Sequence, residues 1–224
     1  MLKNKNTRLL EYLYSLINEN RKTIFQKKII HRTKYISIAL ENVYQNRNIS
    51  AAIRSADCFG IQDIHIINRN VFQDNNQVSL GAEKWINTFN YKDSHQAIEV
   101  LKKNGYKIIV TTPHDAKVNL FELDLNLGKQ VLFFGSEIEG CSNYLLNNAD
   151  ITVNIPSYGF TESFNISVAV SLCLQHITYK LRQSNIDWEL SMEEKTDVLL
   201  YWLRKSIKSS DKIEDRFLRD YKLR

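Results

Sequence analysis

Apolar and polar residues alternate along this chain in two distinct patterns. Short, nearly continuous apolar runs, rich in Ile and Val, are typical of strands that are buried on both faces. Such runs lie at residues 35–40, 64–67, 106–112, 131–134 and 151–155. Between most of these runs, apolar residues recur every three or four positions, which predicts amphipathic helices. Strands that alternate with helices predict an α/β fold with a parallel sheet.

The helix predicted after the first strand carries polar residues near the carboxyl end of that strand. Asn48 or Ser50 can cap this helix, and Gly60 ends it before the next strand. Arg54 lies in its first turns, where the spacing fits both a surface role and a functional role. Asn48 by itself is most simply a cap. Spacing alone therefore assigns a function to neither residue.

Both ends of the chain are predicted to be helical. Helices at residues 6–19 and 22–31 precede the first strand, and helices that begin after Ser191 and at residue 211 follow the last one. We expect a basic helical arm at residues 1–32, an α/β domain at residues 33–184 and a helical extension at residues 185–224. The polar stretch at residues 71–90 predicts a long loop with a short helical piece.

The helix that follows Ser163 is apolar nearly all round, over residues 166–181. Ser163 is the expected N-cap of this helix. Such a helix must be buried on most of its sides, by its own sheet and by a second copy of the chain. This pattern predicts a homodimer.

Composition narrows the class of protein. With 224 residues, the chain can form one sizeable domain with helical additions. Cys58, Cys141 and Cys173 are odd in number and widely spaced, which argues against a disulfide framework and a zinc site and favours a reducing cytoplasm. No apolar window approaches the roughly 18 to 20 residues of a membrane span. We therefore expect a soluble, cytoplasmic protein without a metal and without a membrane partner.

The formal net charge of +5 is unevenly distributed. Residues 1–40 hold nine Lys or Arg against two Glu, whereas residues 187–224 hold nine of each sign. A run of charge more often marks a solvated helix surface. The alternative is an arm that contacts the phosphate groups of a polyanion.

Two polar loops follow strands, and each carries groups suited to chemistry. The segment GSEIEG at residues 135–140 contains two carboxylates, which would repel an anion and suit a cation such as a sulfonium. Ser163, Phe164 and Asn165 lie in the second loop. Because open α/β sheets bind ligands at the carboxyl ends of their strands, we expect the two loops to converge. The motifs of dinucleotide oxidoreductases, P-loop NTPases, zinc proteases and serine hydrolases are all missing from the sequence.

Three segments together resemble a known family. They are NVYQNRNISAAIRSADCFGIQDIHII at residues 42–67, VLFFGSEIEG at residues 131–140 and IPSYGFTESFNISVAVSL at residues 155–172. In order and spacing, they resemble the three motifs of the SpoU-type branch of the SPOUT RNA 2′-O-ribose methyltransferases. The resemblance spans about residues 33–182. One departure is QNRN at residues 45–48, where the family often has QPHN.

This resemblance implies an architecture, a cofactor and a set of site residues. The fold would be an α/β parallel sheet with a C-terminal trefoil knot (the SPOUT or α/β-knot fold), flanked by N- and C-terminal helical arms. The active site would lie at the interface of a homodimer and would bind S-adenosyl-L-methionine. The family's cofactor-binding positions match Thr111, Gly135, Glu137, Gly140, Ile155, Phe164 and Asn165. Its polar catalytic positions match Asn48, Arg54, Glu137, Ser163 and Asn165.

The helical arms further resemble those of the branch that methylates guanosine 18 of tRNA, so the resemblance implies tRNA as the substrate. A ribosomal RNA substrate, or a non-catalytic RNA-binding relative, are the alternatives. The basic side chains expected to contact RNA are Arg8, Arg21, Lys22, Lys27, Lys28, Arg32 and Arg54. A guanidinium with a pKa above about 12 is a poor proton acceptor. We therefore expect Arg54 to hold a phosphate and to stabilise negative charge on the 2′-oxygen.

Overall fold

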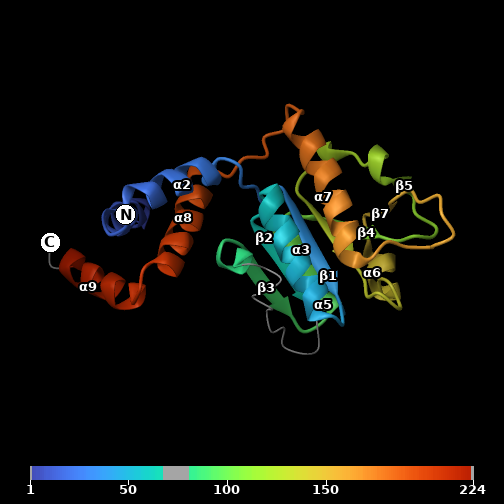
Figure 1. The fold of residues 1–224 in the computed structure, drawn as a ribbon, viewed down its shortest axis with the longest axis horizontal. Helices are drawn as coiled ribbons and strands as arrows, with labels where there is room; N and C mark the ends of the chain where they lie inside the picture. The colour runs from blue at the N-terminus through green and yellow to red at the C-terminus, as the bar shows by residue number, and fades with distance from the viewer. Residues whose placement is uncertain (1, 68–80, 223–224) are drawn as a thin grey trace. The chain divides into compact units, whose positions relative to one another are not determined.

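The computed structural model describes residues 2–67 and 81–222 and contains a parallel sheet (Figure 1). The sheet has seven strands in the order β3-β2-β1-β6-β4-β7-β5, and each neighbouring pair is parallel. The strands are β1 (Ile36–Glu41), β2 (Asp63–Ile67), β3 (Asn87–Tyr91), β4 (Lys107–Thr111), β5 (Val118–Asn119), β6 (Gln130–Phe134) and β7 (Ile151–Asn154). The predicted α/β class and parallel sheet are confirmed.

Strands β3 and β5 lie where no strand is predicted. All of β3 but Tyr91 falls within the predicted loop at residues 71–90, so that part of the prediction is wrong. Residues 71–80 of the predicted loop lie outside the described residues. The short helical piece is the single turn η1 (Ala82–Lys84). Within the part of the chain that the structure describes, β3 pairs with β2 alone and β5 with β7 alone, so both are edge strands. Apart from Tyr91, which is buried, their residues are partly or fully exposed, and no apolar run marks them.

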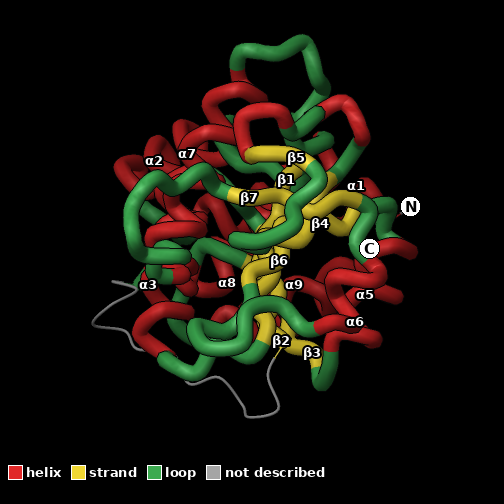
Figure 2. The backbone as a smooth tube through the Cα atoms, turned by 90° about the vertical axis from the view of Figure 1, so that its right-hand side faces the viewer, coloured by secondary structure: helices red, strands yellow, loops and turns green. Residues whose placement is uncertain are grey.

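Helices cover both faces of the sheet, as Figure 2 shows edge-on. The helices of one face are α3 (Asn46–Phe59) and α7 (Ile166–Arg182), and those of the other are α5 (Ser94–Lys103) and α6 (Asn143–Asn148). The short turns η2 (Leu120–Glu122) and η3 (Leu125–Leu127) lie between β5 and β6 in the chain. Alternate strand residues serve two cores: Ile38 and Leu40 pack on the side of α3 and α7, and Ala39 on the side of α5 and α6.

The N-terminal helices α1 (Leu2–Ser15) and α2 (Glu19–Ile29) begin at Leu2 and Glu19 rather than at residues 6 and 22, and two helices that cover the sheet begin from caps other than those predicted. Helix α3 begins at Asn46, ahead of both predicted caps, so neither Asn48 nor Ser50 caps it. Helix α7 is capped by Asn165 rather than by Ser163. Helix α3 starts from Gln45, whose side chain makes no capping hydrogen bond, so capping propensity does not mark its start. Before α7 the sequence offers both Ser163 and Asn165, and propensity alone does not choose between them.

The chain divides into two compact units, one of residues 33–188 and one of residues 1–32 and 189–224. The first is the sheet unit, and we call the second the helical unit. The helical unit consists of α1 (Leu2–Ser15), α2 (Glu19–Ile29), α8 (Met192–Ser206) and α9 (Ser210–Lys222). In its core Phe25 packs on Trp202, with ring centroids 5.3 Å apart. None of the helices described is long and apolar enough to cross a membrane.

Candidate active site

Three segments named by the sequence leave the sheet at one edge. Strand β4 lies between β6 and β7, with Val110 paired to Phe133 and Thr111 paired to Val153. Because parallel strands end at the same edge of a sheet, Thr111 and the loops after β6 and β7 start side by side. We call residues 135–140 the first loop and residues 155–165 the second loop.

The first loop is closed on itself by its backbone. Ser136 and Gly140 exchange two backbone hydrogen bonds of 3.0 Å each, and the Ser136 hydroxyl accepts a third from the Glu139 N–H at 3.0 Å. Gly140 has a φ of 69°, in the left-handed region that favours glycine. The closed ring turns its tip outward, where the Ile138 side chain is 84% exposed.

At Gly135 the backbone passes too close to the returning chain for any side chain. A Cβ atom at this position would lie 2.0 Å from the carbonyl carbon of Gly140 and 2.1 Å from the backbone nitrogen of Cys141. These neighbours are backbone atoms and cannot swing away. Glycine is therefore required here by close approach, which is how glycines act in loops that wrap a ligand or another segment.

One hydrogen bond joins the first loop to α3. The Asn48 side-chain amide donates to Oε1 of Glu137 at 2.6 Å, across 89 residues of sequence. Asn48 is 6% exposed in the first turn of α3. The structure thus brings together two of the predicted catalytic residues, and it gives Asn48 a partner other than the helix it was expected to cap.

Hydrogen bonds connect Thr111, at the end of β4, to Phe133 before the first loop and to Cys141 after it. The Thr111 hydroxyl donates to the carbonyl of Phe133 at 2.8 Å, and the Thr111 carbonyl accepts from the Cys141 thiol at 3.5 Å. Burial, and after it the nearby Glu41 carboxylate, raises the pKa of the Cys141 thiol. A thiol that stays protonated is a poor nucleophile, so we assign Cys141 a structural role beside Thr111.

The second loop is open and apolar at its surface. Ile155 is partly buried, whereas Tyr158 and Phe160 are almost fully exposed and Phe164 is 41% exposed. Ser163 is exposed and makes no hydrogen bond to a described residue. Asn165 accepts hydrogen bonds from the backbone N–H and the hydroxyl of Ser167, at 2.9 and 2.6 Å. No hydrogen bond links Ser163 or Asn165 to Asn48 or Glu137 among the described residues.

Arg54 stands apart from the bonded residues. Its side chain is exposed on α3 and makes no hydrogen bond or ion pair with a described residue. Beside it, a groove of about 390 Å³ runs between α3 and α7 and is lined by residues that include Ala51, Ser55, Ser167 and Leu172. Arg54 follows Ala51 by three residues and precedes Ser55 by one in α3, but it does not itself line the groove.

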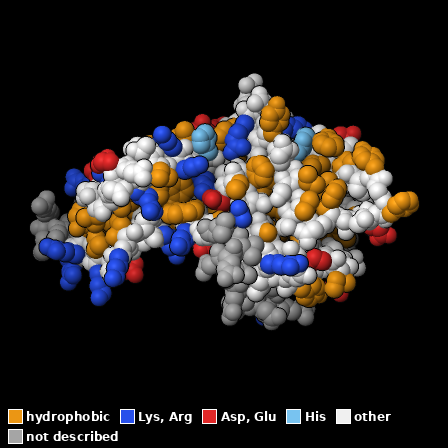
Figure 3. Space-filling view, viewed as in Figure 1, with side chains coloured by type: hydrophobic (Ala, Val, Ile, Leu, Met, Phe, Trp, Pro, Cys, Tyr) orange, Lys and Arg blue, Asp and Glu red, His pale blue; other side chains and the backbone are white. Residues whose placement is uncertain are grey.

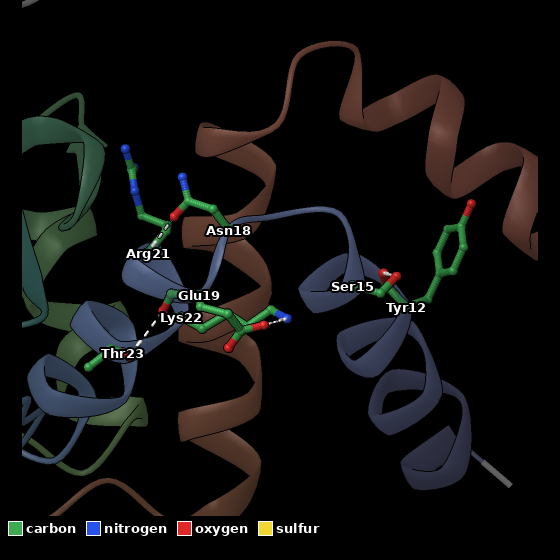
Figure 4. Close-up of polar contacts among 7 residues, drawn as sticks. All are labelled: Tyr12, Ser15, Asn18, Glu19, Arg21, Lys22 and Thr23. Atoms are coloured by element: carbon green, nitrogen blue, oxygen red, sulfur yellow. Dashed lines mark hydrogen bonds and ion pairs between the residues drawn. The ribbon is translucent and has the colours of Figure 1, made fainter.

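The predicted RNA-contacting side chains of the helical unit lie in different surroundings. Arg8, Lys27 and Lys28 are exposed, and Figure 3 shows Lys and Arg side chains gathered on this unit. Arg21 donates a 3.4 Å hydrogen bond to Ser206, and Lys22 forms an ion pair with Glu19 at 2.6 Å; Figure 4 shows both basic side chains.

Arg32 does not fit the predicted RNA surface. It is 6% exposed, and its guanidinium carbon lies 5.2 Å from the ring centroid of Trp202. A buried guanidinium over an aromatic face stabilises the packing of the unit and is not accessible to phosphate. We correct the prediction accordingly and assign Arg32 to the core of the helical unit.

Glu41 is a site residue that sequence reasoning missed. It is 2% exposed at the end of β1 and accepts hydrogen bonds from Ser142, which follows the first loop. The only signal in the sequence is a charged residue that ends an apolar run. Across the described residues, no three His, Cys, Asp or Glu side chains are grouped as a metal site would need.

Two loops leave the carboxyl edge of a parallel sheet, and one of them is held by the Asn48–Glu137 hydrogen bond. This arrangement is typical of ligand-binding α/β proteins. Residues 35–175 match the family described as the SpoU rRNA Methylase family, and the chain belongs to this family. A tRNA (guanosine(18)-2′-O)-methyltransferase of Borreliella burgdorferi is 38% identical over 204 residues, which cover 91% of this chain and 93% of that protein. The enzyme of the same name from Thermus thermophilus is 30% identical over 190 residues, covering 84% and 97%.

Solved structures agree with this assignment. The A. aeolicus TrmH/SpoU tRNA modifying enzyme superposes with a TM-score of 0.77 at 25% identity, covering 85% of this chain and 98% of that one. The SpoU methyltransferase AviRb from Streptomyces viridochromogenes, in complex with AdoMet, superposes with a TM-score of 0.61 at 19% identity, covering 71% and 62%. The second likeness supports the fold alone.

Proposed function

We propose that this protein transfers the methyl group of S-adenosyl-L-methionine to the ribose 2′-oxygen of guanosine 18 in tRNA. The observation that carries the proposal is the extent of the likeness: 91% of the chain, and therefore parts of both units, aligns with a relative of that activity. A 2′-hydroxyl as the acceptor requires RNA rather than DNA. Such a substrate agrees with the cytoplasmic setting that the unpaired cysteines predict.

The residues present fit the cofactor. The first loop offers a closed ring of backbone groups next to a carboxylate, Glu137, which suits a sulfonium. Exposed Phe164 offers an apolar surface for an adenine ring. We assign the cofactor to Thr111, Gly135, Glu137, Gly140, Ile155, Phe164 and Asn165. When bound, the cofactor supplies an electrophilic methyl carbon to an in-line attack.

The chain itself must position the attacking oxygen. Alignment of nucleophile and electrophile supplies several kcal/mol, about 7–11 in well-oriented intramolecular reactions. Arg54 is exposed and lacks a described partner, so its five N–H donors are available to a phosphate and to the 2′-oxygen. Ser163 and Asn165 would orient the same ribose. Asn48 acts through Glu137, to which it donates a hydrogen bond.

We further propose that the active form is a homodimer and that the C-terminal part of the sheet unit forms a trefoil knot. Val168, Leu172 and Tyr179 are exposed on α7, which leaves an apolar surface for a second copy. The knot is proposed from membership of the SpoU family and from the likeness to the A. aeolicus TrmH/SpoU structure. Light scattering on wild-type protein and on Leu172→Lys tests the dimer, since a charge in a buried interface should release monomers.

RNA binding would rest on the basic helical unit. Arg8, Arg21, Lys22, Lys27 and Lys28 remain in the proposed surface, while Arg32 does not. If these side chains neutralise phosphates, the logarithm of the affinity falls linearly with the logarithm of salt concentration. Replacing Lys27 and Lys28 by Ala should flatten that slope by about two contacts.

The deciding experiment is labelled methyl transfer to matched RNAs. We expect transfer to a tRNA transcript and none to the same transcript with 2′-deoxyguanosine at position 18. The family description names ribosomal RNA, so ribosomal RNA is the second candidate substrate and belongs in the same assay. Transfer to ribosomal RNA alone would replace the proposal. A protein that binds neither cofactor nor methyl-acceptor RNA would instead be a non-catalytic relative.

A further inference from the structure

Glu41 is a carboxylate buried at the end of β1, 2% exposed, in a part of the sheet next to the first loop. Its carboxylate accepts three hydrogen bonds from two segments. Oε2 accepts from the backbone N–H of Ser142 at 2.8 Å, and Oε1 accepts from the Ser142 hydroxyl at 2.7 Å and from the Ser94 hydroxyl. A charge is rarely buried without such a set of donors, because its desolvation is costly.

The bonds to Ser142 hold the end of the first loop. Ser142 lies two residues after Gly140, whose backbone closes the loop on Ser136 and passes beside Gly135. The Ser142 hydroxyl also accepts from the Leu145 N–H at 3.3 Å and so begins α6. Glu41 thus links the segment that leaves the loop, residues 140–142, to the end of β1. Ser94, on α5, shares the carboxylate but does not adjoin the loop.

We propose that Glu41 is a positioning residue for the methyl donor, acting through Ser142 on the first loop. This inference rests on the proposed function, in which that loop holds S-adenosyl-L-methionine. The loop meets its ligand through backbone groups, whose directions depend on where the two ends of the loop are held. Glu137 and Asn48 fix the outer part of the loop, and Glu41 fixes its return.

The first test compares Glu41→Gln with Glu99→Gln, measuring cofactor affinity by calorimetry and methyl transfer by label. The Glu99 side chain is exposed on α5 and makes no hydrogen bond to a described residue. Gln keeps the size of Glu41 but removes its negative charge and leaves one acceptor oxygen in place of two, so the charge-assisted bonds to Ser142 and Ser94 are lost. We expect Glu41→Gln to raise the Kd and KM for S-adenosyl-L-methionine about tenfold. The kcat at saturating cofactor should stay within about twofold, and Glu99→Gln should match wild type.

The second test applies if Glu41→Gln does not fold. Ser142→Ala and Ser94→Ala each remove one hydroxyl from the same carboxylate, but only Ser142 adjoins the loop. We expect weaker cofactor binding from Ser142→Ala alone, and recovery with Ser142→Thr, which keeps the hydroxyl.

The outcomes separate the two proposals. Wild-type protein that neither binds the cofactor nor methylates RNA contradicts the proposed function. If the wild type does both and Glu41→Gln changes only the melting temperature, or if Ser94→Ala weakens cofactor binding as much as Ser142→Ala, Glu41 is a general stabiliser and the positioning role is wrong.

Discussion

The two loops at the carboxyl edge of the sheet are built in opposite ways. The first is closed by the Ser136–Gly140 backbone bonds and held from outside by Asn48 and Glu41. In the second, residues 156–164 make no backbone hydrogen bond to a described residue, and Tyr158 and Phe160 are almost fully exposed. One chain suffices to shape the first loop. The second leaves apolar surface that a ligand or another copy must cover.

The largest expected difference between the loops is in their tolerance of a Gly→Ala substitution. Gly135→Ala places a Cβ atom 2.0 Å from Gly140, and we expect it to cost more than about 4 kcal/mol of unfolding free energy or to prevent folding. Gly159→Ala, in the second loop, meets nothing closer than 4.0 Å and should change stability by less than about 1 kcal/mol. Urea unfolding measures both, and equal losses would refute the contrast between the loops.

Arg54 separates catalysis from the order of the loops, because it bonds to neither of them. We expect Arg54→Ala to lower kcat/KM for tRNA about 10²- to 10³-fold, as for loss of a preorganised donor, without changing cofactor affinity or stability. Arg54→Lys should recover little, since an ammonium does not reproduce the planar fork. Lys103→Ala, exposed on α5, serves as the control. Near-full turnover by Arg54→Lys would rule out bidentate positioning.

The predicted site residues of the two loops should also differ in their effect on stability. Asn48→Ala removes the 2.6 Å bond to Glu137, and we expect a loss of about 1–3 kcal/mol. Ser163→Ala removes no bond to a described residue and should stay within about 0.5 kcal/mol. Thermal denaturation of both variants decides, and a larger loss for Ser163→Ala would mean that the second loop is the better ordered one.

Acid should lower the unfolding free energy of the protein through His65, in strand β2 of the sheet that carries both loops. Burial lowers the pKa of His65 in β2 from 6.5 to about 4; its Nδ1 lies 3.0 Å from the Tyr91 hydroxyl, and its ring lies among Phe89, Tyr91 and Tyr106. Between these pH values the unfolded chain binds more protons, so stability falls as pH falls through this window. We expect about 2 kcal/mol from this group between pH 7 and pH 5.

The matched variant is His65→Gln, compared with wild type by urea unfolding at pH 7 and at pH 5. Gln does not titrate, so this part of the pH dependence should disappear while the pH 7 contrast between Gly135→Ala and Gly159→Ala remains. An unchanged pH slope in the variant would place the acid sensitivity elsewhere.

The sequence predicts those parts of the fold that apolar residues mark. Strands β1, β2, β4 and β6 carry nearly continuous apolar runs because both their faces are covered. Strand β7 is only partly buried, and within it Ile151 and Val153 alternate with polar residues. All five strands lie where they are predicted. The edge strands β3 and β5 lack that burial and therefore that signal. The location of the site at the strand ends follows from a parallel sheet. The long-range pairs do not, since no local pattern shows that Asn48 meets Glu137.

Burial of charge is also invisible to patterning. Arg and Glu are residue types that are usually found at the surface, yet Arg32 and Glu41 are only 6% and 2% exposed. Each is buried because of partners far along the chain, Trp202 for the first and Ser94 and Ser142 for the second. Charge counts therefore overestimate the basic surface of the N-terminal arm by one guanidinium.

The cap of α7 restricts what Asn165 can recognise. Its amide oxygen is already occupied by the backbone and hydroxyl of Ser167, so only its NH₂ group remains for a visiting molecule. The Asn165 side chain can therefore donate a hydrogen bond to an acceptor on a ligand, but it cannot readily accept one from a further donor. Any hydrogen bond that Asn165 makes to a ligand at the start of α7 should therefore be to an acceptor atom of that ligand.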